Sequence, residues 1–289
     1  MRRWREAAVD AARFVSARPE LWLPGALAWL SSVGWLPLIV AVARPPSVAE
    51  LTFLGARIVT SGAWPWNAVL IGAVIVTIVL AAFALTAIAN AVLIALLERR
   101  APASSDAARL LAVNLVAALP AVFAMLAVLL AAAVIAPREF NAPDPASGPV
   151  LRTIAMLTPY LVLLGVTAMA GGALAAVAGR LALRARGGIA MALRSAPSVT
   201  LGASPTTHAI AACAVQLAFL GSATLLLAVL WAPIGDRLDG GGEIEVAVGL
   251  LLVGFVAIWL CLVLAGGALH AWSAATWSRL IATDASGRT

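Results

Sequence analysis

The sequence predicts an all-α, polytopic membrane protein, a bundle of six transmembrane helices. Hydrophobic residues make up 63% of its 289 residues and charged residues only 11%, whereas a soluble domain carries roughly a quarter charged residues. Six apolar runs are each long enough to cross the hydrocarbon core as a helix, which takes about 20 residues. Because the runs do not alternate between polar and apolar residues, they exclude a membrane β-barrel.

The six runs are the predicted spanning helices. In chain order they are Leu21–Ala43, Asn67–Leu97, Leu110–Ala136, Ile154–Ala182, Thr207–Trp231 and Ile244–Leu269. Pro24 lies in the first turn of the first run, where a missing N–H costs little, but Pro37 is interior and predicts a kink. We interpret the kink at Pro37 as packing geometry or, alternatively, as a gate. The last run is expected to continue as a helix to about Ile281.

The distribution of arginine sets the predicted orientation. The chain has no lysine, so its net charge of +6 comes from arginine. Fourteen arginines lie in the N-terminal arm, the loops after the second and fourth helices, and the C-terminal tail; five lie in the other loops. By the positive-inside rule, an even number of spans then places both termini on the cytoplasmic side of a bacterial inner membrane. The same pattern favours membrane topology over a nucleic-acid partner.

The N-terminal arm, residues 1–18, has the pattern of an amphipathic helix. Trp4, Ala8, Ala11 and Val15 fall at helical spacing and make an apolar stripe. Such a helix can lie in the membrane interface with its arginines on anionic headgroups; an ordinary topogenic arm is the alternative. The residues expected to contact anionic lipid are Arg2, Arg3, Arg5, Arg13, Arg180, Arg184 and Arg186.

The chain is predicted to be a single membrane domain, 1–289, built from an internal repeat. Each unit has a cytoplasmic lead, a helix out and a helix back, and the units are about 1–100, 101–186 and 187–289. Two short strings recur at equivalent places: Asp10–Arg13 matches Asp106–Arg109, and Ala170–Leu174 matches Ala265–Leu269. Repeats of one orientation imply pseudo-rotational symmetry about the membrane normal.

Polar residues at membrane depth are the candidate binding residues. No acidic residue falls within the core of a spanning run, which argues against a proton symporter or pump but leaves a passive or lipid pathway open. Asn90 and Asn114 lie at similar depth on consecutive helices, so an interhelical hydrogen bond is predicted, with a substrate site as the alternative. Gln216 is nearer mid-bilayer and needs a partner, a water or a ligand. Pro37 completes this set as a possible gate.

Two rows of small residues predict close helix packing. Gly171, Ala175 and Gly179 form one row, and Gly267 and Ala271 belong to the other. Such rows let helix backbones approach closely. They are interpreted as packing surfaces within the bundle, with the helix of a partner protein as the alternative.

No sequence motif predicts catalysis, a cofactor or a metal. The chain has no Walker A sequence, no G-x-S-x-G, no H-E-x-x-H and no C-x-x-C. His208 and His270 are the two histidines, and without a nearby carboxylate or thiolate they are expected to make hydrogen bonds rather than a zinc site. Cys213 and Cys261 lie in apolar runs and are expected to be buried free thiols.

Basic leads precede the apolar hairpins, as in Ala192-Leu193-Arg194-Ser195-Ala196-Pro197. In this layout the chain resembles the multi-helix membrane domain attached to some bacterial glycerophosphodiester phosphodiesterases and related stand-alone membrane proteins. The resemblance is one of layout. It implies a multi-helix membrane bundle and no enzymatic activity, because the hydrolase half of those proteins is not in this sequence.

Two functions are therefore expected from the sequence. The first is a non-catalytic subunit, scaffold or accessory of an inner-membrane assembly, with a membrane protein partner or further copies of itself. The alternative is a helix bundle that transports or handles a small molecule or a lipid, with a pathway near Gln216, Asn90 and Asn114 and a gate at Pro37.

Overall fold

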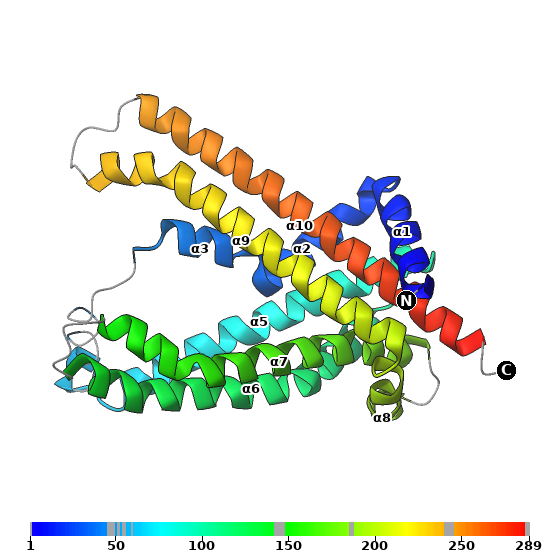
Figure 1. Cartoon of the computed structure of the whole chain (residues 1–289), viewed down its shortest axis with the longest axis horizontal. Coiled ribbons are helices and arrows are strands. Elements are labelled where there is room, and N and C mark those ends of the chain that lie inside the picture. The colour runs from blue at the N-terminus through cyan, green and yellow to red at the C-terminus, as the bar shows by residue number, and fades with distance from the viewer. Residues whose placement is uncertain are drawn as a thin grey trace. The chain divides into compact units, whose positions relative to one another are not determined.

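The computed structural model describes residues 2–44, 50, 53, 56–58, 60–141, 148–184, 188–239 and 246–286. Within these ranges the chain contains helices and no strand (Figure 1). The side chains of Arg2, Asn141, Asp239 and residues 283–286 are not described. Arg186 falls outside the described residues.

The N-terminal part is a series of short helices rather than one continuous span. Helix α1 covers Arg2–Ser16, and the 3₁₀ turn η1 covers Pro19–Leu21. Three further segments follow: α2 (Trp22–Trp29), the π-helical turn η2 (Leu30–Gly34) and α3 (Leu36–Val42). The α2–η2 stretch and α3 meet at an angle of 49°.

Five long helices account for most of the chain. They are α5 (Trp66–Leu97), α6 (Ser104–Asn141), α7 (Pro149–Arg184), α9 (Ala203–Asp239) and α10 (Val246–Ser286). Each is long and apolar enough to cross a membrane, and the bent stretch from Pro19 to Val42 makes a sixth candidate. The shorter α8 covers Gly188–Thr200. The chain is a multi-pass membrane protein, and the predicted all-α fold is confirmed; six spans were predicted, and the structure has five to six candidates.

Local chemistry explains where the helices begin and end. At the end of α5 the backbone of Arg99 is left-handed, with φ at 53°, and the Arg100 N–H donates to the Ala95 carbonyl, which is a common way to close a helix. At the start of α6 the Asp106 carboxylate accepts a hydrogen bond from the Ala103 N–H, at 3.2 Å. Pro120 lies inside α6, which continues through it.

The chain divides into two compact units, each described here by itself. The first unit contains residues 1–10, 103–213 and 274–289, and the second contains residues 11–102 and 214–273. Helices α1, α9 and α10 each contribute residues to both units. These boundaries cut across the three predicted repeat-like segments, so the compact units are not the predicted repeats.

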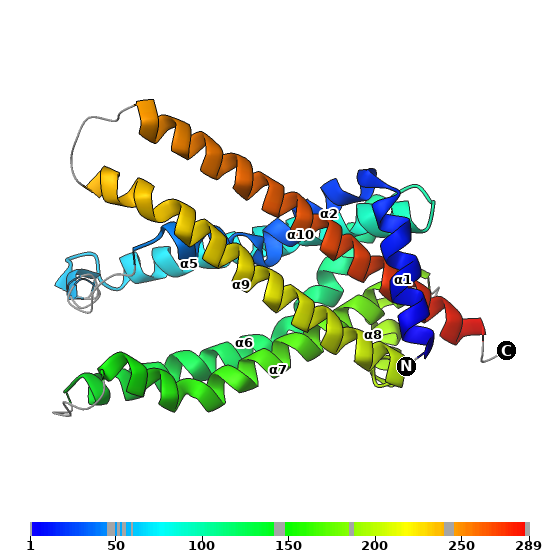
Figure 2. The same ribbon diagram turned by 45° about the horizontal axis from the view of Figure 1, so that its top comes forward.

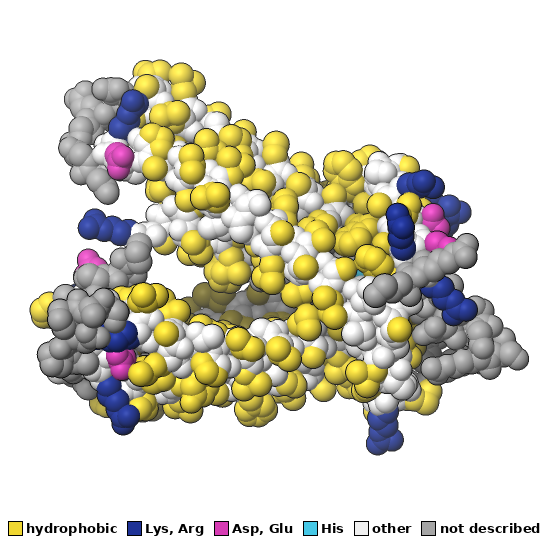
Figure 3. Space-filling view, viewed as in Figure 1, with side chains coloured by type: hydrophobic (Ala, Val, Ile, Leu, Met, Phe, Trp, Pro, Cys, Tyr) yellow, Lys and Arg dark blue, Asp and Glu magenta, His cyan; other side chains and the backbone are white. Residues whose placement is uncertain are grey.

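The first unit is built on an antiparallel pair, α6 and α7, which lie side by side in both ribbon views (Figures 1 and 2). A Cβ on Gly171 would lie 2.5 Å from the Ala117 carbonyl oxygen, so the two backbones are in close contact there. Hydrophobic side chains line the visible length of the pair, and charged ones lie at its left end in this view (Figure 3). At one end Arg152 Nε donates to Glu139 Oε2 at 2.7 Å. Helix α8 packs against α7 and α6.

The second unit places α2 and η2 against α5 and α10. Gly25 of α2 and Gly267 of α10 allow this approach, because a Cβ on either would overlap the backbone of the other helix. Trp29, at 1% exposure, is the largest fully buried side chain among the described residues. Its ring packs edge-on to Phe219 of α9, with centroids 5.6 Å apart. An aromatic pair, Trp29 and Phe219, is therefore part of the core of this unit.

Candidate functional site

The first spanning stretch is broken where the sequence predicts a kink. Pro37 lies in the first turn of α3, directly after the π-helical turn η2 and Trp35. Proline has no N–H for the preceding turn, and π-helical turns are frequent at functional sites. Pro37 is buried. The break thus turns α3 away from the line of α2 without exposing the proline ring.

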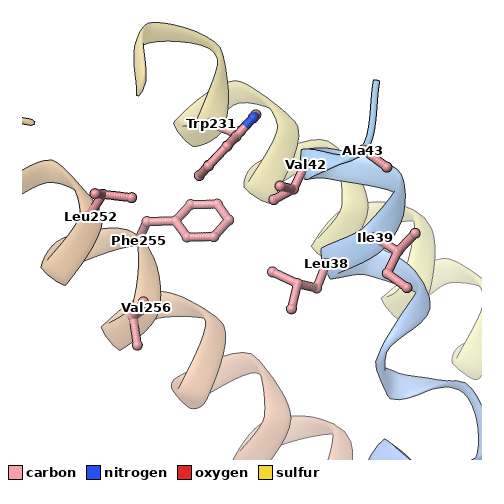
Figure 4. A pocket seen from close by; sticks show the side chains of 8 residues that line it. All are labelled: Leu38, Ile39, Val42, Ala43, Trp231, Leu252, Phe255 and Val256. Carbon is pink, nitrogen blue, oxygen red and sulfur yellow. The ribbon is translucent and has the colours of Figure 1, made fainter. Parts of the chain in front are cut away.

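The broken helix forms one wall of an apolar groove in the second unit. The groove has a volume of about 400 Å³. Its lining residues are Leu38, Ile39, Val42, Ala43, Trp231, Leu252, Phe255 and Val256 (Figure 4). The first four come from α3 and its end, Trp231 comes from α9, and the last three come from α10. All eight are aliphatic or aromatic, so the groove favours hydrocarbon over polar groups.

The far wall of the groove is fixed by an aromatic pair. The rings of Trp231 and Phe255 lie 5.3 Å apart at 56°, a tilted arrangement favourable for aromatic rings. Leu227 and Ile234 on α9 are fully buried in the same hydrophobic cluster, which also includes Leu38 and Val42 at partial burial. The groove is therefore a recess in a packed seam of three helices rather than a gap between separate elements.

Two interhelical hydrogen bonds join α5 to the rest of the second unit. Thr86 Oγ1 lies 2.8 Å from Ser31 Oγ on η2. One turn further along α5, Asn90 Oδ1 lies 2.9 Å from His270 Nε2 on α10. The partner of Asn90 is therefore His270 rather than the predicted Asn114, which is half-buried on α6 in the other unit. Asn90 therefore contributes a hydrogen bond between α5 and α10.

Gln216 lies half-buried on α9 in the second unit. It precedes Phe219 and Leu220 by about one helical turn, and these two residues pack against Trp29. Among the described residues no hydrogen bond joins the Gln216 amide to another side chain or to the backbone. The groove is not lined by Gln216, Asn90 or Asn114. Of the four predicted binding residues, only Pro37 adjoins it, directly before Leu38.

Two further indoles in this unit have polar atoms without partners. The Nε1 atoms of Trp29 and Trp259 are both buried and make no hydrogen bond. Both rings belong to the cluster around Val263 on α10. From sequence alone, these tryptophans are indistinguishable from packing residues deep in a span. The spacing of Leu252, Val256 and Trp259 places them on one face of α10, as packing residues also would be.

The arginines expected on headgroups divide into exposed and buried groups. Arg3, Arg5, Arg13 and Arg184 are exposed. Arg180 is only 4% exposed, which corrects the expectation that it contacts lipid. Its guanidinium donates to the carbonyls of Ala176 and Ala274 at 2.8 and 2.7 Å, and to Ser278 Oγ at 3.0 Å. Arg180 therefore joins α7 to α10 within the first unit.

The apolar stripe of the N-terminal arm is covered by protein. Ala8, Ala11 and Val15 of α1 are all buried. Trp4 Nε1 donates to Nδ1 of His208, at 3.3 Å, and the His208 ring packs edge-on against Trp277. The interface-lying arrangement required this stripe to face lipid. The structure places it against the chain and leaves only the arginine-bearing face exposed.

The predicted glycine rows lie within the bundle. Gly171 faces Ala117, and a Cβ on Gly179 would lie 2.8 Å from Leu110 Cδ2. Ala175, between them on α7, is half-buried. On α10, Gly267 contacts α2 and Ala271 is fully buried. These rows are used for contacts inside the chain, which leaves little of them for a partner's helix.

In the described part of the chain no three His, Cys, Asp or Glu side chains are placed to hold a metal ion. Cys213 and Cys261 are free thiols, but the expectation that both are buried is wrong, since Cys213 is half-buried and Cys261 is exposed. No family model, no curated protein and no solved structure matches the chain.

Proposed function

We propose that this chain is a non-catalytic multi-pass membrane protein that binds the hydrocarbon part of a lipid. The observation that supports this most directly is the groove between α3, α9 and α10, with its entirely apolar lining. It lies on helices apolar enough to cross a membrane. The excess of arginine in the N-terminal arm and alternate loops supports a bacterial inner membrane with both termini in the cytoplasm.

The chemistry of the lining selects a hydrocarbon ligand. The groove volume of about 400 Å³ falls within the range of roughly 300–1,000 Å³ that is common for ligand sites. A polar ligand would lose its hydration there without receiving hydrogen bonds in return. None of the eight lining side chains can act as a nucleophile, acid or base, which supports binding rather than catalysis.

The broken helix supports a groove that can change its width. In an unbroken helix each turn is tied to the next by backbone hydrogen bonds, but the π-helical turn before Pro37 interrupts that regular ladder. Leu38, Ile39 and Val42 follow the break directly. A small rotation of α3 about the break would therefore widen or narrow one wall of the groove, as expected for a gate at Pro37.

The experiment compares two tryptophan substitutions, one on α3 and one at the residue that ends it. Ala43→Trp places a large ring at the rim of the groove, where Ala43 is exposed. Val40→Trp is the matched control, because Val40 is 61% exposed and does not line the groove. Each protein is incubated with a photoreactive phosphatidylcholine in vesicles and the cross-linked peptides are identified.

We expect labelling of α3, α9 and α10 around the groove in the wild type and in Val40→Trp, and a several-fold loss in Ala43→Trp. Equal labelling of all three proteins would contradict the proposal. So would labelling spread evenly over the exposed apolar faces, with no preference for the groove.

A second candidate function is a subunit or scaffold of a membrane assembly. It is favoured by the first half of α5, where residues 69–81 are exposed on every face. A helix with no neighbour on any side is a natural place for the helix of a partner or of a further copy. Native mass spectrometry after gentle extraction tests this: a stoichiometric partner protein lost on Leu70→Arg would support it, and a partner-free chain would not.

We also propose that the six spans derive from three repeated hairpins. The recurrence of Ala170–Leu174 at Ala265–Leu269 and of Asp10–Arg13 at Asp106–Arg109 supports the repeat.

A further inference from the structure

Two buried indole N–H groups lie beside the groove, in a neighbouring cluster of α2, α9 and α10 that shares Trp259 with the groove's own cluster. Trp29 Nε1 and Trp259 Nε1 are both fully shielded and have no hydrogen-bond partner among the described residues. An indole nitrogen can only donate a hydrogen bond. A buried donor without an acceptor costs free energy, and such groups are rare unless something satisfies them. Two in one cluster indicate that an acceptor is expected there.

The Trp29 ring is held so that its donor cannot turn toward another group. A Cβ on Gly266 would lie 2.5 Å from indole Cδ2, and one on Gly34 would overlap the same ring. Phe219 packs edge-on against it from α9. Because neighbours contact the ring from three sides, rotation to a different hydrogen-bond partner is blocked by packing.

The helical register connects these donors to the groove. Phe255 and Val256 line the groove, Trp259 follows about one turn later on the same face of α10, and Val263 follows after another turn. Trp259 packs in the cluster beside the groove as well as in the cluster around Trp29. A lipid hydrocarbon chain that enters the groove beside Phe255 and continues along this face of α10 reaches Trp259 before Val263.

We infer that the seam between α2, α9 and α10 binds a neutral lipid that carries a carbonyl oxygen, with its hydrocarbon chain in the groove. The carbonyl oxygen accepts from the indole N–H of Trp259 and from that of Trp29. Residues 22–42, 203–235 and 246–278, which include α2 and the parts of α9 and α10 around both donors, carry no Asp, Glu, Lys or Arg, so a charged headgroup would be buried there without compensation. The claim that a hydrocarbon chain occupies the groove rests on the proposed function. The claim that the lipid carries a carbonyl oxygen rests on the two unpaired indole N–H groups.

The test uses a matched pair of probes. Methyl oleate is a neutral chain with an ester carbonyl, and octadecene is a hydrocarbon of matched length without one. Delipidated protein in detergent is incubated with both at equal concentration and repurified, and the bound probes are quantified by gas chromatography. In Trp259→Phe one donor is removed. At position 29 the indole is replaced by benzothienylalanine, which keeps the ring shape and replaces the N–H with sulfur.

We expect the wild type to retain several-fold more methyl oleate than octadecene, and the ratio to approach one in Trp259→Phe and in the benzothienylalanine protein. Ala43→Trp is expected to lower retention of both probes. No preference in the wild type, or a preference that survives both indole changes, would overturn the carbonyl lipid and leave the groove proposal intact. Full retention of both probes by Ala43→Trp would overturn the groove proposal instead.

Indole ¹⁵N–¹H spectra give a second readout that does not depend on affinity. Methyl oleate should shift the Trp29 and Trp259 signals while octadecene leaves them unchanged, and Trp231, which lines the groove, should respond to both. If the Trp29 N–H already donates to the face of the Phe219 ring, its signal will not move with methyl oleate, and that outcome also overturns the inference.

Discussion

His270 Nε2 on α10 lies 2.9 Å from Asn90 Oδ1 on α5, and this hydrogen bond joins two residues that are 180 positions apart in the chain. Since the amide oxygen can only accept, the histidine proton must lie on Nε2. One turn away, the Ser31 and Thr86 hydroxyls make a second interhelical hydrogen bond. Together they fix the register of α5 against the broken helix and α10.

The Asn90–His270 hydrogen bond should contribute measurably to stability. In membranes such bonds average about 0.6 kcal/mol and reach about 1.7 kcal/mol. We expect Asn90→Leu to lower the free energy of unfolding by about 0.5–1.5 kcal/mol, with most of the loss shared with His270→Phe in a double-mutant cycle. Asn114→Leu is the control, since Asn114 makes no such bond to a described residue. Additive effects of Asn90→Leu and His270→Phe would show that the bond does not form in the folded protein.

The contact between Gly25 and Gly267 should tolerate no side chain. In Gly267→Val the new atoms would meet the backbone of Trp22 and Ala26, so α2 and α10 must separate. Overpacking of this kind costs about 1–3 kcal/mol, and backbone cannot move aside as a flexible side chain does. Gly254→Val on the same helix has open space around it and should leave the melting temperature nearly unchanged. Equal melting temperatures for the two variants would place the α2–α10 contact elsewhere.

Replacing Arg180 with lysine should destabilise the protein more than replacing it with methionine. Lysine keeps a buried charge but cannot reach the Ala176 and Ala274 carbonyls and Ser278 together, whereas methionine removes the charge. We expect Arg180→Lys to lose about 2–4 kcal/mol of unfolding free energy and Arg180→Met clearly less. Arg13→Lys, on the exposed face of α1, should have no measurable effect. Chemical unfolding in detergent measures all three, and a greater loss for methionine than for lysine would contradict this account of the site.

The Arg152–Glu139 ion pair should hold the ends of α6 and α7 together. Both side chains are mostly buried, at 16% and 14% exposure, and Arg152 also donates to the Glu139 carbonyl. We expect a coupling of about 1–2 kcal/mol between Arg152→Met and Glu139→Gln, above the value of about 0–1 kcal/mol typical of exposed pairs. The pair Arg100–Glu98, longer at 3.3 Å, serves for comparison and should couple more weakly. Coupling that vanished in moderate salt would show that Arg152 and Glu139 are solvated.

The proposed orientation can be tested by thiol labelling in intact cells. In a background of Cys213→Ala and Cys261→Ala, Asp236→Cys should react with an impermeant reagent, and Ser195→Cys should react only after the cells are permeabilised. Both positions are exposed in the structure, so access depends on the side of the membrane. The reverse pattern would invert the topology and with it the interpretation of the arginine distribution.

The spanning helices could be predicted from sequence because their length and apolarity follow from the thickness of the bilayer. Their ends could not. Helix α6 continues to Asn141, beyond the predicted end at Ala136, because charged residues outside the hydrocarbon core can still be helical. The kink near Pro37 was predictable from the missing N–H, but the π-helical turn before it has no comparable signature.

The candidate site was less accessible to sequence reasoning. Asn90 was identified as a polar residue at depth that needs a partner, but depth alone does not identify His270 as that partner. Counting arginines gives an orientation without showing which of them is buried, so Arg180 was grouped with exposed residues. The groove was missed because it has no polar residue to mark it, and it becomes visible only when α3, α9 and α10 are brought together.

The first unit is made of segments that lie far apart in the sequence, and this sets the order in which it can form during synthesis. Arg180 donates to Ala274 and Ser278, which are 94 and 98 residues later in the chain. A ribosome will have released α7 into the bilayer well before these acceptors are synthesised. During that interval the guanidinium must remain hydrated or lie among lipid headgroups at the membrane surface. Its burial therefore follows insertion of the last span, and closure of this unit is a late step of biosynthesis.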